Sequence, residues 1–145
     1  MSNVVCIANQ KGGVGKTTTA VNLSASLGVF EKTTLLVDCD PQANATSGLG
    51  IDKTGLAATL YDGLLGRKGA EALLRDSAIA SLKVIPSNVQ LIGFEVEMMS
   101  EPDREKALKR LIDPLRERFE YIILDCPPSL SLLTVNALTA ADALL

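Results

Sequence analysis

The sequence predicts a three-layer α/β fold with a mostly parallel central sheet, and three observations support this prediction. First, continuous apolar runs stand at residues 4–8, 34–37 and 121–124, with a weaker run at 82–85. Runs that do not alternate polar and apolar residues are typical of strands buried on both faces. Second, helical patterns separate these runs, which favours an α/β architecture. Third, 145 residues with 47% hydrophobic and 21% charged residues suit one globular domain.

The helices are predicted from the period of their apolar residues. The first is expected to end at Gly28, a residue type that commonly follows the last helical turn. Pro114 is expected to kink or divide the helix predicted over residues 103–118. Residues 48–69 are glycine-rich and are expected to form loops with short helices. The predicted helices cover residues 17–27, 88–99, 103–118 and 130–141.

Composition excludes several classes of protein. Lys and Arg number 14 against 17 Asp and Glu, so the net charge of −3 is not that of a basic nucleic-acid binder. The sequence contains no His, which removes His-based metal sites and Ser-His-Asp triads. No signal peptide and no transmembrane helix are expected. We interpret Cys6, Cys39 and Cys126 as small, buried, reduced side chains of a cytoplasmic protein.

A glycine-rich segment after the first strand carries the chemistry. Residues 11–18 read Lys-Gly-Gly-Val-Gly-Lys-Thr-Thr and lead into the first predicted helix. Glycines let the backbone wrap a phosphate, and the start of the helix supplies N–H donors. Lys16 is expected to reach the β- and γ-phosphates, and the Thr17 hydroxyl to ligate Mg²⁺. The strict phosphate-loop pattern is not met, because Gln10 stands at its first glycine position, and Lys11 is an additional lysine. The alternative is a glycine-rich turn without a ligand, against which the Gly-Lys-Thr ending argues.

Aspartates stand where two further predicted strands end. Asp38 and Asp40 follow the second apolar run, and Asp125 follows the third. Ligands of open α/β sheets bind at the carboxyl ends of strands, so these side chains are expected near the phosphate loop. A lone aspartate at a strand end is more often a turn former or a helix cap. Two such sites beside a phosphate loop favour a role in holding Mg²⁺ and water.

Three segments together resemble the ParA/Soj family of partition ATPases, which is part of the deviant Walker A class of P-loop proteins. They are KGGVGKTT from residue 11, DCDPQANATSGLG from residue 38 and IILDCPPSLSLLTVNAL from residue 122. The first segment indicates only the wider class, which includes MinD-like ATPases and the nitrogenase iron protein. The other two narrow the resemblance to ParA-like members. It implies one P-loop ATPase domain over residues 1–145, truncated at its C-terminal side, since family domains run on for roughly another hundred residues.

The resemblance also implies roles for individual residues. Thr17 would ligate Mg²⁺ with support from Asp38 and Asp125, and Asp40 would orient or activate the attacking water. Lys11 would reach across a two-fold interface onto the partner's nucleotide, as an arginine finger does. The catalytic residues would thus be Lys11, Lys16 and Asp40. The nucleotide would be bound by Lys11, Gly12, Gly13, Val14, Gly15, Lys16, Thr17 and Thr18.

The implied function is an ATP-dependent switch ATPase for chromosome or plasmid partition. It would hydrolyse ATP with Mg²⁺ as a homodimer, act with a ParB-type protein, and bind DNA without sequence preference in the full-length protein. It would be cytoplasmic and nucleoid-associated, with no membrane partner. Clustered Lys and Arg for DNA are absent here, so such contacts are expected outside these residues. The alternative is a MinD-like or other ParA-like ATPase that positions a membrane or protein cargo. Less favoured are a metal-cluster reductase of the same superfamily and a fragment that binds no nucleotide.

Overall fold

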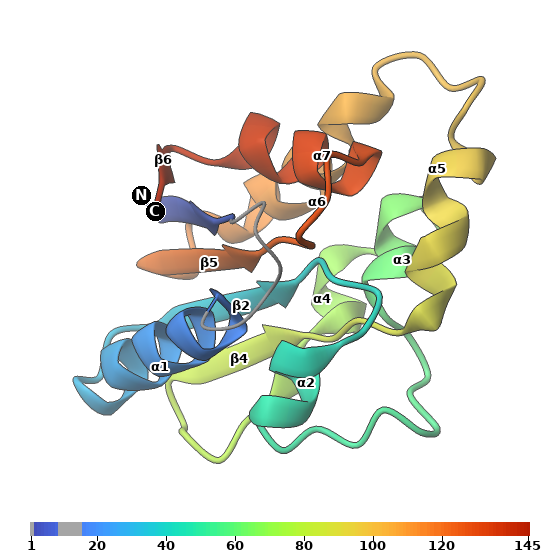
Figure 1. The fold of residues 1–145 in the computed structure, drawn as a ribbon. Helices are drawn as coiled ribbons and strands as arrows, with labels where there is room; N and C mark the ends of the chain where they lie inside the picture. The colour runs from blue at the N-terminus through green and yellow to red at the C-terminus, as the bar shows by residue number, and fades with distance from the viewer. Residues whose placement is uncertain (1, 9–15) are drawn as a thin grey trace.

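The computed structural model describes residues 2–8 and 16–145 and confirms the predicted α/β architecture (Figure 1). Helices lie on both sides of a central sheet, and the last strand, β6, lies beside β1. The elements are β1 (Asn3–Ile7), α1 (Lys16–Val29), β2 (Thr34–Asp38), α2 (Asn44–Gly48), α3 (Leu60–Leu64), α4 (Ala70–Leu73), β3 (Arg75–Asp76), β4 (Leu82–Ile85), η1 (Val89–Gly93), α5 (Phe94–Glu97), η2 (Arg104–Lys106), α6 (Ala107–Ile112), η3 (Asp113–Leu115), β5 (Tyr121–Asp125), α7 (Leu132–Ala140) and β6 (Ala143–Leu144), where η denotes a 3₁₀ helix.

The sheet is parallel except at one edge. Among the described residues its order is β3-β4-β2-β5-β1-β6, and β3 is antiparallel to β4. The short strand β3 was not predicted, whereas the four apolar runs all form strands. In the register, Asp125 of β5 pairs with Ile7 of β1 on one side and with Asp38 of β2 on the other. Because these strands run in the same direction, their carboxyl ends meet at one edge of the sheet.

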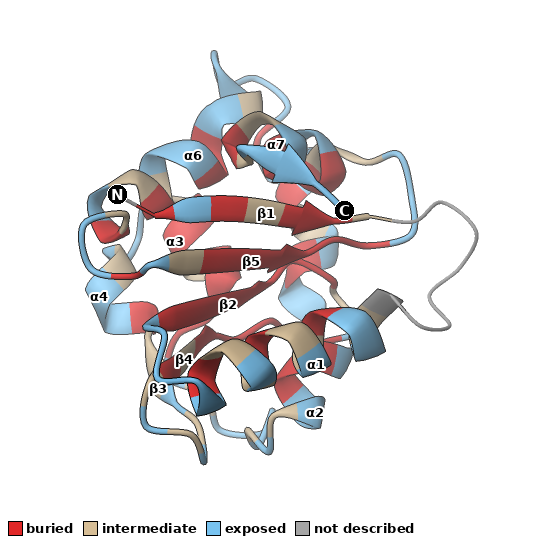
Figure 2. Cartoon of the chain, turned by 90° about the vertical axis from the view of Figure 1, so that its left-hand side faces the viewer, coloured by how far each residue is buried: buried red, intermediate tan, exposed pale blue. Residues whose placement is uncertain are grey.

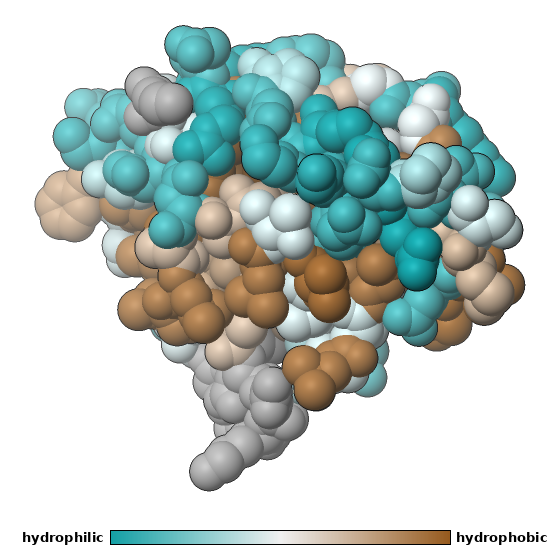
Figure 3. Space-filling view, turned by 90° about the horizontal axis from the view of Figure 1, so that it is seen from above, coloured by the Kyte–Doolittle hydropathy of each residue, from teal (hydrophilic) through white to brown (hydrophobic). Residues whose placement is uncertain are grey.

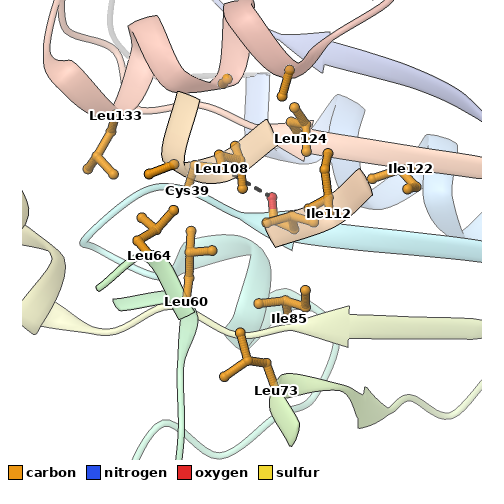
Figure 4. Close-up of a cluster of buried hydrophobic side chains, with 14 of the residues drawn as sticks. Cys39, Leu60, Leu64, Leu73, Ile85, Leu108, Ile112, Ile122, Leu124 and Leu133 are labelled. Atoms are coloured by element: carbon orange, nitrogen blue, oxygen red, sulfur yellow. Dashed lines mark hydrogen bonds between the residues drawn. The ribbon is translucent and has the colours of Figure 1, made fainter. Parts of the chain in front are cut away.

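Successive residues of each strand face opposite layers, as the pleat requires. On β2, Leu36 packs in one cluster with Ala20 of α1 and Ala45 of α2. Leu35 and Val37 belong to the larger cluster on the other face of the sheet. Figure 4 shows that larger cluster, in which side chains of α3, α4, α6 and α7 meet those of β4 and β5. Figure 2 shows that the central strands are buried while the outer faces of the helices are exposed. The strands are therefore covered on both faces, as their continuous apolar runs predicted.

The end of the first helix differs from its prediction. Gly28 lies inside α1, which continues to Val29. The left-handed residue after the helix is Glu31, with φ of 62°. A Cβ atom at Gly28 would come within 2.9 Å of Ile79 Cγ2. Gly28 is therefore explained by close packing against the segment before β4, and the prediction that it ends the helix was wrong.

Pro114 divides the third predicted helix, as expected. The region predicted as one helix over residues 103–118 consists of η2, α6 and η3. Pro114 stands at the start of η3, directly after α6 ends at Ile112. Proline lacks the backbone N–H that would continue an α-helix, so the chain tightens into a 3₁₀ turn. Apolar side chains of this region, such as Leu108 and Leu115, remain buried.

Some apolar side chains of α7 and β6 are exposed. Figure 3 views the molecule from above and shows apolar side chains gathered over part of that face. Val135 and Leu138 of α7 are partly exposed, and Leu144 of β6 is 63% exposed. In the described part of the chain, no helix has the length and apolar character needed to cross a bilayer. Other exposed apolar side chains lie at the end of α1 and on η1 and α5, such as Val29, Ile92 and Val96.

Gly63 of α3 provides a test of the packing between helices. A Cβ atom there would come within 2.8 Å of Leu111 Cδ2 and would also collide with Leu73, which is fully buried. We expect Gly63→Ala to lower the free energy of unfolding by about 1–2 kcal/mol, because overpacking outweighs the better helix propensity of Ala. Urea unfolding measures this change.

Gly93→Ala is the matched control. Its Cβ atom would approach only Glu97 Oε1, at 3.4 Å, and the backbone of Gly93 is helical. This variant should be as stable as the parent or more stable by up to about 1 kcal/mol. Equal stabilities of the two variants would contradict the packing described for α3.

Candidate functional site

The carboxyl ends of β1, β5 and β2 form the floor of the candidate site. Ile7, Asp125 and Asp38 stand at the same level of the sheet. The ladders continue beyond the strands, since the N–H of Cys39 donates to the carbonyl of Asp125 at 2.9 Å. In the same way, the N–H of Cys126 donates to the carbonyl of Ile7 at 3.2 Å. These bonds fix the positions from which three loops leave the sheet.

The first turn of α1 brings Thr17 to this edge. The Thr17 hydroxyl donates a hydrogen bond to Oδ2 of Asp125 at 3.2 Å. Asp125 is fully buried, and Thr17 is partly exposed. Hydroxyl and carboxylate oxygens are the hard ligands that Mg²⁺ prefers, so this pair fits the predicted metal position. Among residues 2–8 and 16–145 no cluster of three or more His, Cys, Asp or Glu could hold a metal ion by itself. Mg²⁺ in proteins commonly keeps several waters and takes only one or two protein ligands besides phosphate oxygens.

Asp38 is enclosed by donors of its own chain. Its Oδ2 accepts from the hydroxyl of Thr46 at 2.7 Å and from the Thr46 N–H at 2.8 Å. Its Oδ1 accepts from the N–H of Asp40 at 3.1 Å. Burial raises the pKa of Asp38 to about 6, the charge of Asp125 adds to this rise, and the bonds from Thr46 and Asp40 oppose it. The carboxyl group of Asp38 thus organises the segment that follows β2.

That segment folds back into a tight turn around Asp40. Asp40 is 6% exposed, and its Oδ1 accepts from the N–H of Gln42 at 3.0 Å. Its carbonyl accepts from the N–H of Ala43 at 2.9 Å, and Ala43 is left-handed with φ of 57°. Helix α2 begins directly after this turn. The aspartate side chain is therefore fixed in a turn rather than carried on an extended loop.

The structure brings four of the predicted site residues to one edge of the sheet. They are Thr17, Asp38, Asp40 and Asp125, each held by the contacts above. Thr18 lies on α1 and is exposed. Lys16 is the first residue of α1. The rest of the predicted nucleotide site lies outside the described residues and comprises Lys11, Gly12, Gly13, Val14 and Gly15.

The sequence analysis did not identify two residues of the site. Thr46 and Ser87 are both fully buried. The N–H of Ser87 donates to the hydroxyl oxygen of Thr46 at 3.0 Å, and the Ser87 hydroxyl donates to the carbonyl of Asp40 at 2.5 Å. Ser87 follows β4, which is the neighbour of β2 in the sheet. The rule that located Asp38 and Asp125 at strand ends would therefore also have located Ser87.

The three cysteines lie beneath and beside this edge. All are buried, and no disulfide joins them, which agrees with their interpretation as small buried side chains. The Sγ atoms of Cys6 and Cys126 are 2.7 Å apart. The contact with Cys6, together with burial, holds the pKa of the Cys126 thiol well above its usual value. Small side chains at these positions let the strand ends pack closely below the site.

The burial of Asp38 predicts a specific pH dependence of stability. Its folded pKa of about 6 lies above the ordinary value of 3.8, so between these values the folded chain holds a proton that the unfolded chain releases. The contribution of the Asp38 carboxyl group to the free energy of unfolding is therefore fully present below pH 3.8. It is lost as the pH rises to about 6. The total loss is roughly 3 kcal/mol.

Urea unfolding of the parent and of Asp38→Asn, without Mg²⁺ and from pH 4 to 7, measures this effect. The stability of the parent relative to the variant should fall across this range, because Asn does not titrate and other groups cancel in the difference. A difference that is constant with pH would contradict the environment described for Asp38.

Comparison with known proteins places the chain in a family. A family model described as an AAA domain matches residues 2–145. The chromosome partitioning protein ParA of Myxococcus xanthus is 50% identical over 145 residues, which is 100% of this chain and 51% of that protein. The sporulation initiation inhibitor protein Soj of Bacillus subtilis is 49% identical over 143 residues, which is 99% of this chain and 56% of that protein. The chain thus spans about half the length of these relatives.

A solved structure shares the whole described fold. The crystal structure of cobyrinic acid a,c-diamide synthase from Mycobacterium smegmatis, with bound ADP and magnesium, has 41% sequence identity and a TM-score of 0.95. The match covers 99% of this chain and 58% of that one. Fold and sequence thus agree, and the chain belongs to the AAA domain family and, within it, to the ParA/Soj type.

Proposed function

We propose that this protein is an ATP-dependent, dimerising ATPase that acts in the partition of a chromosome or plasmid. One observation carries the proposal: the hydroxyl of Thr17, a residue of the phosphate-loop motif in the first turn of α1, contacts Asp125 at 3.2 Å. A hydroxyl and a carboxylate at this place in a P-loop fold are the groups that bind Mg²⁺ beside the nucleotide phosphates. The aspartates after β2 lie at the same edge of the sheet.

The nucleotide would bind at the start of α1. Backbone N–H groups from Gly12 to Thr18 would cradle the phosphates, with the side chain of Lys16 on the β- and γ-phosphates. Thr17 would ligate Mg²⁺ directly. Asp125 would hold the Thr17 hydroxyl and, with Asp38, support water molecules on the metal. The solved structure with bound ADP and magnesium supports this choice of cofactors.

Hydrolysis would depend on Asp40. The carboxyl group of Asp40 is held in a turn at the edge where the phosphates would lie. From there it would orient or activate the water that attacks the γ-phosphate. Magnesium would neutralise charge on the phosphate oxygens, and Lys16 would stabilise the charge that develops as the bond breaks.

Dimerisation would complete the site. Lys11 would extend across a two-fold interface onto the nucleotide of the partner, and Gly12 would permit the close approach. Each nucleotide would then hold both subunits, which couples ATP binding to assembly. The name of the ParA relative supports a role in partition over the positioning of a membrane or protein cargo. A ParB-type protein and non-specific DNA would be the partners, with DNA contacts made outside these residues.

The first test is binding of Mg-ATP, measured by calorimetry. We expect the parent chain to bind and Lys16→Ala to lose about 10- to 100-fold in affinity, which corresponds to the loss of a charged hydrogen bond to phosphate. Lys32→Ala is the matched control, because the Lys32 side chain is half exposed and precedes β2 at the opposite end of the sheet. Absence of binding by a folded parent chain would refute nucleotide binding by these residues.

The second test separates binding from assembly. Lys11→Ala should bind Mg-ATP within about threefold of the parent affinity, because Lys11 contributes to the site of the partner subunit. In sedimentation the parent and Lys32→Ala should shift from monomer to dimer with Mg-ATP, whereas Lys11→Ala should remain a monomer. Dimerisation of Lys11→Ala at the parental level would overturn the role given to this lysine.

A further inference from the structure

Ser87 lies at the end of a strand to which the proposed mechanism gives no role. It follows β4 by two residues and is fully buried. Its N–H donates to the hydroxyl oxygen of Thr46 at 3.0 Å, and its own hydroxyl donates to the carbonyl of Asp40 at 2.5 Å. One serine thus contacts two parts of the segment that follows β2.

These contacts close a ring of hydrogen bonds around the backbone of Asp40. The Thr46 hydroxyl donates to Oδ2 of Asp38 at 2.7 Å, and the Asp40 N–H donates to Oδ1 of the same carboxyl group at 3.1 Å. The ring therefore runs from Asp38 through Thr46 and Ser87 to Asp40 and back. All four residues are buried, with Asp40 the most exposed at 6%.

Both backbone polar groups of Asp40 are consequently hydrogen-bonded, each to a different part of the chain. Its N–H is held by Asp38 on the same segment, and its carbonyl is held by Ser87, which is 47 residues away in the sequence. The N–H of Ala43 also donates to this carbonyl, but that bond closes the local turn and moves with it. Ser87 is thus the group that ties the Asp40 peptide to the neighbouring strand.

We propose that Ser87 is a positioning residue for the hydrolytic step, and that Thr46 connects it to Asp38. The inference rests on the proposed function, in which Asp40 acts on the attacking water. Ser87 acts through the backbone of Asp40 and need not contact the nucleotide. An error of about 1 Å in the position of a catalytic group can lower a rate by about 100-fold. Loss of one of several restraints on Asp40 should lower kcat by about tenfold with little change in ATP affinity.

The experiment measures Mg-ATP hydrolysis and ATP affinity for Ser87→Ala in the full chain. We expect kcat to fall about tenfold while ATP affinity stays within about twofold of the parent. Ser77→Ala is the matched control, because the Ser77 hydroxyl also donates to a backbone carbonyl, that of Leu82, but at the opposite end of β4. The control should keep the parental kcat.

Two further comparisons separate positioning from a general structural role. In Asp40→Ala, the added Ser87→Ala change should lower the residual rate no further, since the group that Ser87 positions is already gone. Thr46→Ser keeps the hydroxyl and should hydrolyse ATP much faster than Thr46→Val, which lacks it. An unchanged kcat in Ser87→Ala, or an equal loss with and without the Asp40 side chain, would overturn the proposal.

Hydrogen exchange distinguishes this proposal from the proposed function. Ser87→Ala should speed backbone exchange of residues 40–46 relative to Ser77→Ala, and this measurement requires no hydrolysis. If the parent hydrolyses no ATP but the exchange rises, the proposed function fails while the restraint of Asp40 by Ser87 stands. If the exchange is unchanged, the inference fails whatever the parental activity is.

Discussion

The parallel register of β1, β5 and β2 is the constraint on which the rest of the site depends. It sets Ile7, Asp125 and Asp38 at one level, so that the carboxyl ends of these three strands lie side by side. The loop after β1 leads to α1, whose first turn carries Thr17 over Asp125. A shift of one residue in either pairing would turn these side chains to the other face of the sheet. Because both faces of the strands are packed with apolar side chains, the core resists such a shift.

The buried carboxyl group of Asp38 requires hydrogen-bond donors around it. A carboxyl group without access to water is costly unless donors surround it, and the rise of its pKa to about 6 reflects that cost. Three donors meet it, two from Thr46 and one from the backbone of Asp40. The need to satisfy one buried carboxyl group thus gives the segment after β2 its shape. A residue that weakens the isolated fold at neutral pH thereby orders the turn that holds Asp40.

The strand β2, which ends at the site, packs against helices on both faces of the sheet. Leu36 of β2 packs toward α1 and α2, while Leu35 and Val37 pack toward α3, α6 and α7. Asp38 at the end of β2 and Asp40 just after it are therefore anchored by both layers of helices. Ser87 adds an anchor from β4, on the far side of β2 from β5. Asp38 and Asp40 are thus held by contacts from the helices on both faces of the sheet and from the segment after β4.

The sequence by itself determined the fold class and four strands, and it indicated four candidate site residues that the structure brings to one edge of the sheet. Continuous apolar runs and the phosphate-loop motif are local signals, and Thr17, Asp38, Asp40 and Asp125 are each adjacent to one of them. Gly28 was not predicted correctly, because its packing against Ile79 involves a residue far along the chain. The strand β3 was missed because it has only two residues, Arg75 and Asp76, and neither is apolar.

Only the tertiary structure decided which polar groups satisfy one another. Ser87 bonds to residues 41 and 47 positions away, and Thr17 bonds to a residue 108 positions away. Such contacts follow from strand order and register, which place distant segments within hydrogen-bonding distance. A local pattern can predict where a strand ends. Which side chains meet there depends on which strands are neighbours in the sheet.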